Sequence, residues 1–227
     1  MAEDMKRLPT IGTTRSGPKD RAHQGALAQP ELTEDVRQAI RDLEDEKFIP
    51  ALSKVLALAT FLRLKPASEI ATTESLDERL VSEAKERTIA ILNKLALPHV
   101  SRHRTDHNGF NLERFFIALS DEGATSLQKL MESDEKSPAH NTKIGNALGI
   151  PRSAVDARES RSKTGDKSLL LSYEERLQFF GPELGAFFLF APSRKHWQEE
   201  KVWLQDLVDK IKELSPEIYQ QALRERT

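Results

Sequence analysis

The segment "SRKHWQEEKVWLQDLVDKIKEL", residues 193–214, decides the fold class of this sequence. Apolar side chains recur in it at heptad-like spacing and charged residues fill most other positions, which is the pattern of an amphipathic helix. The apolar seam consists of Trp197, Leu204, Leu207, Ile211 and Leu214. The seam is short for a coiled coil, so we expect it to pack against its own domain. A dimer formed through the helix 197–214 is the alternative, and the sequence leaves the oligomeric state open.

Helical periodicity extends over most of the chain. Apolar residues at spacings of three and four predict further helices at 33–47, 50–64, 73–97, 121–133, 172–180 and 216–225. Thr33 is a suitable N-cap for the first of these, and Ser172 with Glu175 has the pattern of a capping box. The sequence contains no internal repeat and no alternation of strands with helices. We therefore expect a mainly α, multi-helix globular domain.

Two Phe-rich runs, near 115–119 and 186–191, are the candidates for a small β element. Periodicity does not distinguish a buried helix from a strand in runs of this length. Between the predicted helices, residues 98–111 have no period and contain an Asn108-Gly109 turn signal, so we predict an irregular segment there.

The domain organisation follows from composition. Residues 1–30 combine Pro, Gly, Ser, Thr and scattered charges without a period, which predicts a disordered tail. Residues 31–227 are predicted to form a single mainly helical domain. A sub-boundary is expected at 133–140 and a flexible loop at 160–168, because both stretches are polar and lack an apolar stripe.

Composition narrows the class of protein. The 227-residue chain has no Cys, which excludes disulfides, Cys-ligated metals and a thiol nucleophile and suits a cytoplasmic location. The formal net charge is −2, so no strong basic field attracts nucleic acid to the molecule as a whole. The most apolar stretch, 48–64, is too short to span a bilayer and contains Lys54 and Arg63. The N-terminus has no apolar run of the secretory type, and we expect no membrane partner.

The stretch "HNTKIGNALGIPRSAVDARESRSK", residues 140–163, carries the most distinctive pattern. Its apolar and small residues occupy the buried and turn positions expected of two helices joined by a tight turn. These residues are Ile144, Gly145, Leu148, Gly149, Ile150 and Val155. In these residues the stretch resembles the bacterial helix-turn-helix. That resemblance implies that Arg152, Ser153 and Asp156 face the major groove of DNA.

One position departs from that pattern. The motif buries a second apolar residue three positions after Val155, where this sequence has Arg158. A structural corner between two helices needs the same Gly and the same apolar contacts, so the corner also has a purely structural explanation. Residues 143–167 contain three more basic than acidic side chains, which favours contact with phosphate or another anion. The candidate partner-binding residues are Lys143, Arg152, Ser153, Asp156, Arg158, Arg161 and Lys163.

Histidines supply the weaker candidate site. His99, His103 and His107 are spaced by four, which on a helix would stack three imidazoles and could hold a divalent metal. The surrounding residues do not form an amphipathic helix, so a basic loop is the alternative. His140 is a further candidate catalytic residue, although the sequence identifies no partner for it, and Asn141 is expected to cap the helix 141–148.

No pattern in the sequence predicts a cofactor. The phosphate-loop and dinucleotide-binding motifs are absent, as is the nucleophile elbow of the hydrolases. We therefore expect a non-enzymatic cytoplasmic binding or regulatory protein that contacts a protein or a nucleic acid through residues 141–167. The alternatives are a sequence-specific DNA-binding regulator, and a hydrolase or metal enzyme that uses His99, His103, His107 or His140.

Overall fold

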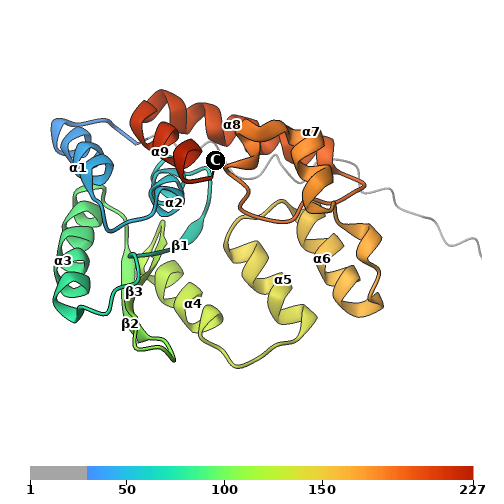
Figure 1. Cartoon of the computed structure of the whole chain (residues 1–227), viewed down its shortest axis with the longest axis horizontal. Coiled ribbons are helices and arrows are strands. Elements are labelled where there is room, and N and C mark those ends of the chain that lie inside the picture. Colours follow the sequence, from blue (N-terminus) through green and yellow to red (C-terminus); the bar gives the residue numbers. More distant parts are fainter. Residues whose placement is uncertain (1–29, 227) are drawn as a thin grey trace, which may run out of the picture.

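The computed structural model describes residues 30–226 (Figure 1). The tail predicted at 1–30 lies outside the described residues except for Pro30. In chain order the elements are α1 (Glu34–Asp45), α2 (Ala51–Phe61), β1 (Ala67–Ala71), α3 (Glu78–Lys94), β2 (His99–Thr105), β3 (Asn111–Ala118), α4 (Asp121–Met131), α5 (Pro138–Ala147), α6 (Arg152–Thr164), η2 (Lys167–Leu169), α7 (Tyr173–Gly185), α8 (Trp197–Leu214) and α9 (Pro216–Arg226). The predicted mainly α fold with a small β element is confirmed.

The small sheet is antiparallel, with the strand order β1-β3-β2. Phe115 and Ile117 of the central strand β3 belong to the large hydrophobic cluster, together with residues of α1, α2, α3, α8 and α9. Phe116 and Ala118 point the other way and pack with Ala124 and Leu127 of α4. Because both faces of β3 are covered, its sequence shows no alternation of apolar and polar residues.

The remainder of the chain frames this core. In Figure 1, α8 and α9 run along the top, where both contact α2, and α5 and α6 lie on the opposite side of the molecule from α1 and α3. The α8 seam buries Leu204, Leu207 and Ile211 in the large cluster, while Trp197 and Leu214 pack against it. The expectation that this seam packs within its own domain is confirmed, and the dimer stays a prediction.

The prediction of an irregular segment at 98–111 is wrong in its first half, where β2 pairs with β3. The strand lies at the edge of the sheet and its side chains are half-buried or exposed, so it carries polar residues instead of an apolar stripe. The predicted turn is present. Asp106 Oδ1 accepts hydrogen bonds from Asn108 N at 2.8 Å and Phe110 N at 2.9 Å, and Gly109 has a φ of 83°.

The strand considered for 186–191 is not formed. The segment follows α7, which kinks at Gly181 and Pro182 and ends at Gly185. Phe187 is fully buried and stacks on Tyr219 of α9 with ring centroids 5.6 Å apart. The run at 186–191 is therefore apolar because it packs against the core after the end of α7. Of the two Phe-rich runs, only the one at 115–119 contributes to a strand.

The prediction of a flexible loop at 160–168 is wrong for residues 160–164, which belong to α6. Helix α6 continues to Thr164, supported by an ion pair of 2.5 Å between Lys163 and Glu159, and Gly165 ends it with a φ of 73°. The short helix η2 follows immediately. Charged residues at a spacing of four stabilise an exposed helix that has no apolar stripe.

Two helix starts differ from the sequence-based prediction. Helix α3 begins at Glu78 after the N-cap Asp77 and not at residue 73, so Leu76 precedes the helix and is 67% exposed. Helix α5 begins at Pro138 and is capped by Ser137 instead of Asn141, because the Ser137 hydroxyl accepts a hydrogen bond from His140 N at 3.0 Å. Strand β1 has the unremarkable sequence ASEIA and was not predicted.

Candidate functional site

Helices α5 and α6 form the corner that the sequence predicted between 140 and 163. Gly149 lies between them with a φ of 64°, and a side chain there would collide with Pro66. The helices cross closely at Gly145, because a Cβ at this position would lie 2.8 Å from Val155 Cγ2. The small residue and the buried Val155 thus have the roles that the pattern assigned to them.

The first turn of α6 holds the three residues that the resemblance assigned to DNA. Arg152 and Asp156 are exposed, but they pair with each other at 2.8 Å. Ser153 is half-buried, and its hydroxyl donates a hydrogen bond of 2.5 Å to Glu200 Oε1 of α8. All three side chains are therefore engaged in interactions within the protein.

The second half of α6 presents a different arrangement of charge. Arg158 and Arg161 are exposed, share one side of the helix at a spacing of three, and make no ion pair with any described residue. Burial lowers the pKa of Arg176 on α7, and the nearby like charge of Arg161 lowers it further. We call Arg158, Arg161 and Arg176 the arginine group, because Arg161 lies three positions from Arg158 on α6 and its charge acts on Arg176. Like charges that lie close together without an acidic partner favour an anion from outside.

The other predicted cations are partly compensated. Lys163 pairs with Glu159, which also accepts a hydrogen bond of 2.6 Å from Thr142 of α5. These two hydrogen bonds hold the pKa of Glu159 below its usual value, and the one from Lys163 has the larger effect. Lys143 is exposed on α5 and contributes, after the hydrogen bond from Ser137, to lowering the pKa of Glu135.

Two cavities flank α6. One, about 320 Å³ in volume, lies between α5, α6 and residues 189–191, and it is walled mainly by apolar side chains. The other, about 450 Å³, lies on the opposite side of α6 and is lined by Ser153, Ser160, Ser168, Lys195 and His196 among others. Arg194 lines the second cavity too, but Glu175 binds its guanidinium through two contacts of 2.6 Å.

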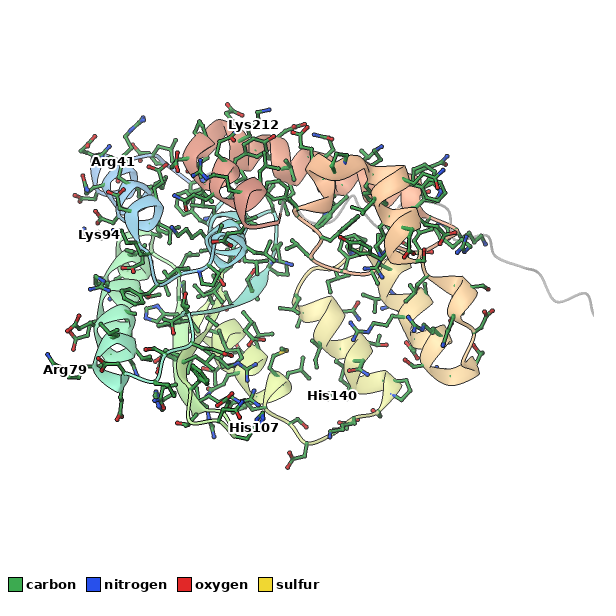
Figure 2. The ribbon with its side chains drawn as sticks, in the orientation of Figure 1. Arg41, Arg79, Lys94, His107, His140 and Lys212 are labelled. Atoms are coloured by element: carbon green, nitrogen blue, oxygen red, sulfur yellow. The ribbon has the colours of Figure 1, made fainter. Side chains whose placement is uncertain are left out.

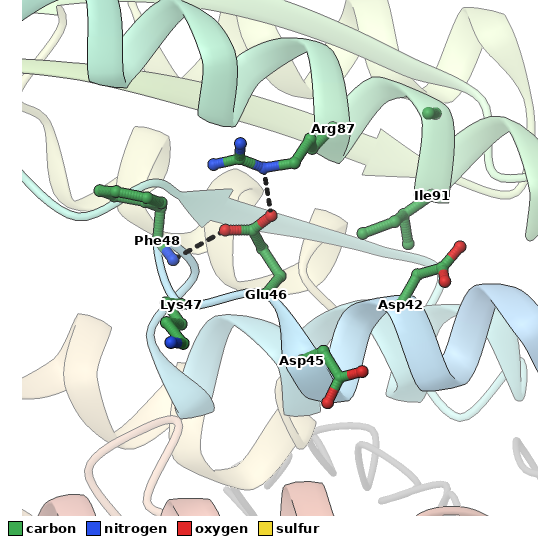
Figure 3. A pocket seen from close by; sticks show the side chains of 8 residues that line it. Asp42, Asp45, Glu46, Lys47, Phe48, Arg87 and Ile91 are labelled. Carbon is green, nitrogen blue, oxygen red and sulfur yellow. Dashed lines mark hydrogen bonds and ion pairs between the residues drawn. The ribbon is translucent and has the colours of Figure 1, made fainter.

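A third hollow, about 510 Å³ in volume, lies between α1 and α3, far from the corner that α5 and α6 form (Figure 3). Its central carboxylate, Glu46, accepts hydrogen bonds from Arg87 Nε at 2.8 Å and from Phe48 N at 2.9 Å. The Arg87 guanidinium also lies over the Phe48 ring, 5.4 Å from its centroid. These side chains satisfy one another, so the hollow offers a ligand little besides Asp45 and Lys47 at its rim.

The three spaced histidines are not gathered into one site. His99 and His103 lie on β2 and His107 in the turn that follows, so the helical geometry that would stack them is absent. Four residues along a strand separate His99 from His103 by roughly 13 Å, which is too far for a shared metal. Among the described residues, no three His, Asp or Glu side chains come together as a metal site.

His140 is buried on α5, and its Nδ1 lies 3.4 Å from Glu135 Oε2 (Figure 2). Ser137 is close by, but its hydroxyl donates to Glu135 Oε1 at 2.5 Å and not to the imidazole. A nucleophilic serine needs direct contact with the base that takes its proton. The cluster therefore acts as a helix cap with an acidic partner that the sequence did not identify.

One charged cluster was not predicted as a site, although it includes the candidate residue His103. Glu113 of β3 is 1% exposed, with Lys85 Nζ 2.7 Å from Oε1 and His103 Nδ1 3.5 Å from Oε2. Its Oε1 has no hydrogen-bond partner of good geometry among the described residues. Sequence reasoning missed this cluster because its three members come from three separate elements. The only available signal was a charged residue, Glu113, close to the apolar run at 115–118 of β3.

Within residues 30–226, none of the helices combines the length and the apolar character needed to cross a lipid bilayer. Comparisons with known protein families, with curated proteins and with solved structures found no match for this chain.

Proposed function

We propose that this protein is a non-enzymatic binding protein whose macromolecular partner contacts the corner 141–167. The observation that carries the proposal is the arginine group, in which Arg158 and Arg161 are exposed without an ion pair to any described residue. Arginine forms bidentate hydrogen bonds with carboxylate and phosphate groups, so a partner with an anionic surface suits this group. The absence of Cys fits a reducing compartment, and we propose the cytoplasm.

A protein with an acidic surface is the favoured partner. The chain has a net charge of −2, so its overall field does not attract a polyanion such as DNA from a distance. A compact group of arginines can still form close pairs with a few carboxylates at a protein interface, where arginine is enriched.

The experiment compares two labelled probes by fluorescence anisotropy, polyglutamate and a random-sequence DNA duplex, each at low and at moderate salt. The test variant carries Arg158→Ala and Arg161→Ala. The matched control carries Arg37→Ala and Arg79→Ala, which remove two exposed arginines on α1 and α3 (Arg79 is labelled in Figure 2). Binding of polyglutamate that is lost in the test variant and kept in the control supports the proposal. If neither probe binds at low salt, the corner is not an anion-binding surface and the proposal fails.

A sequence-specific DNA-binding regulator is the second candidate. The close crossing of α5 and α6 at Gly145 and the left-handed Gly149 favour it, because both features belong to the helix-turn-helix pattern. The pairing of Arg152 with Asp156 and of Ser153 with Glu200 opposes it, since a recognition helix reads bases with these positions. Selection from a random duplex library would enrich a defined sequence if this candidate is right. Binding without enrichment would reduce it to phosphate contact.

A further inference from the structure

The cavity between α5, α6 and residues 189–191, which we call the corner cavity, is the least explained feature of the corner. Its volume is about 320 Å³, which falls within the range of small-molecule sites. Apolar side chains from three separate segments form its walls, namely Ile144, Leu148, Ile150, Leu189 and Phe190.

These side chains are only half-buried, although they face the inside of the corner. Ile144 and Ile150 belong to neither of the two hydrophobic clusters. The Phe190 ring packs edge-to-face on the Trp203 ring, with the ring centroids 5.7 Å apart. Protein interiors are normally packed without voids of this size. An apolar cavity that remains open to one side has the properties expected of a binding site.

The charged residues in its lining indicate which kind of ligand fits. Arg158 and Glu159 both line the cavity. The two oxygens of Glu159 already accept hydrogen bonds, Oε1 from Lys163 at 2.5 Å and Oε2 from Thr142 at 2.6 Å. Arg158 has no ion pair with a described residue, so its guanidinium is the group left to bind a charge. A ligand with an anionic head and an apolar body complements this arrangement.

We propose that the corner cavity binds a small apolar carboxylic acid, such as a medium-chain acyl acid, with its carboxylate on Arg158 and its chain against Ile144, Ile150 and Phe190. This inference stands apart from the proposed function, because it rests on the cavity and on one arginine and not on a macromolecular partner. If both are correct, the acid and an acidic partner compete for Arg158.

The ligands tested are decanoate, decanol and decylamine, which share an alkyl chain and differ in the charge of the head. Binding is measured by calorimetry below the micellar concentration. We expect decanoate to bind more tightly than decanol, and decylamine to bind weakest. Arg158→Gln should weaken decanoate binding by about 10- to 100-fold, the value of a charge-assisted hydrogen bond, and leave decanol unchanged. Arg79→Gln, which changes an exposed arginine on α3 outside the cavity lining, is the control and should bind decanoate normally.

A second variant tests the chain position. Ala191→Phe fills the cavity and should abolish binding of both decanoate and decanol, while polyglutamate binding tests the proposed function separately in the same variant. Methyl NMR of the wild-type protein keeps the test decisive even if this variant does not fold. Decanoate should shift the methyl signals of Ile144 and Ile150 and not that of Ile91, which lines the hollow between α1 and α3. Equal binding of decylamine, an unaffected Arg158→Gln variant, or shifts confined to Ile91 would each overturn the proposal.

Discussion

Ser153 Oγ donates a hydrogen bond of 2.5 Å to Glu200 Oε1, and this contact joins the first turn of α6 to α8. The other carboxylate oxygen, Oε2, accepts a hydrogen bond of 2.7 Å from Ser193 N. Glu200 is 1% exposed, so the corner is fixed to the helix that carries the main core seam through a buried carboxyl group. The start of α6 is thereby held in place, and the free charge of the corner lies in the second half of the helix.

The first prediction concerns the pH dependence that Glu200 introduces. Burial raises the pKa of Glu200 above 4.5, against the smaller opposing effect of hydrogen bonds from Ser153 and Ser193. Above pH 4.5 the unfolded chain releases this proton first, so Glu200 makes a contribution to the free energy of unfolding that falls as the pH rises, opposite in sign to that of carboxyl groups whose pKa is lowered. In Glu200→Gln, whose amide can still bond to both partners, this fall should disappear. Urea unfolding at several pH values measures it, and the exposed neighbour Glu199→Gln should behave like wild type.

Glu200→Ala tests the same contact by removing it. The buried Ser193 N and the Ser153 hydroxyl then lose their acceptor, and we expect a loss of about 3 kcal/mol in the free energy of unfolding at neutral pH. A loss no larger than that of Glu199→Ala would show that the contact does not hold α6 to α8.

The second prediction concerns the helix crossing. In Gly145→Ala the new Cβ would lie 2.8 Å from Val155 Cγ2, and relieving the overlap should cost about 1–3 kcal/mol. Val155→Ala alone leaves a cavity and is also destabilising. Because the second change makes room for the first, the double variant should lose less than the sum of the two single losses. Thermal or urea unfolding of all four proteins gives this coupling energy, and strict additivity would contradict the close crossing.

The third prediction concerns Lys65, which is 2% exposed and donates a hydrogen bond to Leu148 O at the end of α5. Burial lowers the pKa of Lys65 from 10.5 to about 8. Between these two values the unfolded chain binds more protons than the folded chain, so the free energy of unfolding should rise with pH by up to about 3 kcal/mol. In Lys65→Met the contribution of Lys65 should be absent, and only the rise due to Lys54, whose pKa burial also lowers, should remain. Exposed Lys136→Met is the control and should keep the full rise; a full rise retained in Lys65→Met would assign it to other groups.

The fourth prediction concerns the buried carboxylate Glu113. Removing its close cation in Lys85→Met leaves the charge with His103 at 3.5 Å, and since Lys85 is partly exposed we expect a loss of about 1–3 kcal/mol. A second change, Glu113→Gln, removes the uncompensated charge and should recover part of that loss. Urea unfolding measures both, and a double variant less stable than Lys85→Met would show that the carboxylate is satisfied without Lys85.

The sequence determined the elements that depend on local pattern. The seam of α8, the caps at Thr33 and Ser172, the turn at Gly109 and the corner at Gly145, Gly149 and Val155 were all predicted, because periodicity and capping act over a few neighbouring residues. The same local patterns were insufficient where structure depends on distant partners. Strand β2 has an edge-strand sequence that becomes a strand only beside β3, and the apolar run at 186–191 is buried against α9 without forming a strand.

The candidate site divides in the same way. Sequence alone placed Arg158 on a helix beside a tight turn but assigned Arg161 to a flexible loop, and the structure places both arginines on α6. Only the tertiary structure decided which of the predicted residues remain free. Glu200, which is 47 residues from Ser153 along the chain, accepts a hydrogen bond from it. Arg176 of α7 lies near Arg161 of α6. Charge pairing, burial and cavities arise between segments that are far apart along the chain, and sequence spacing does not determine the distances between them.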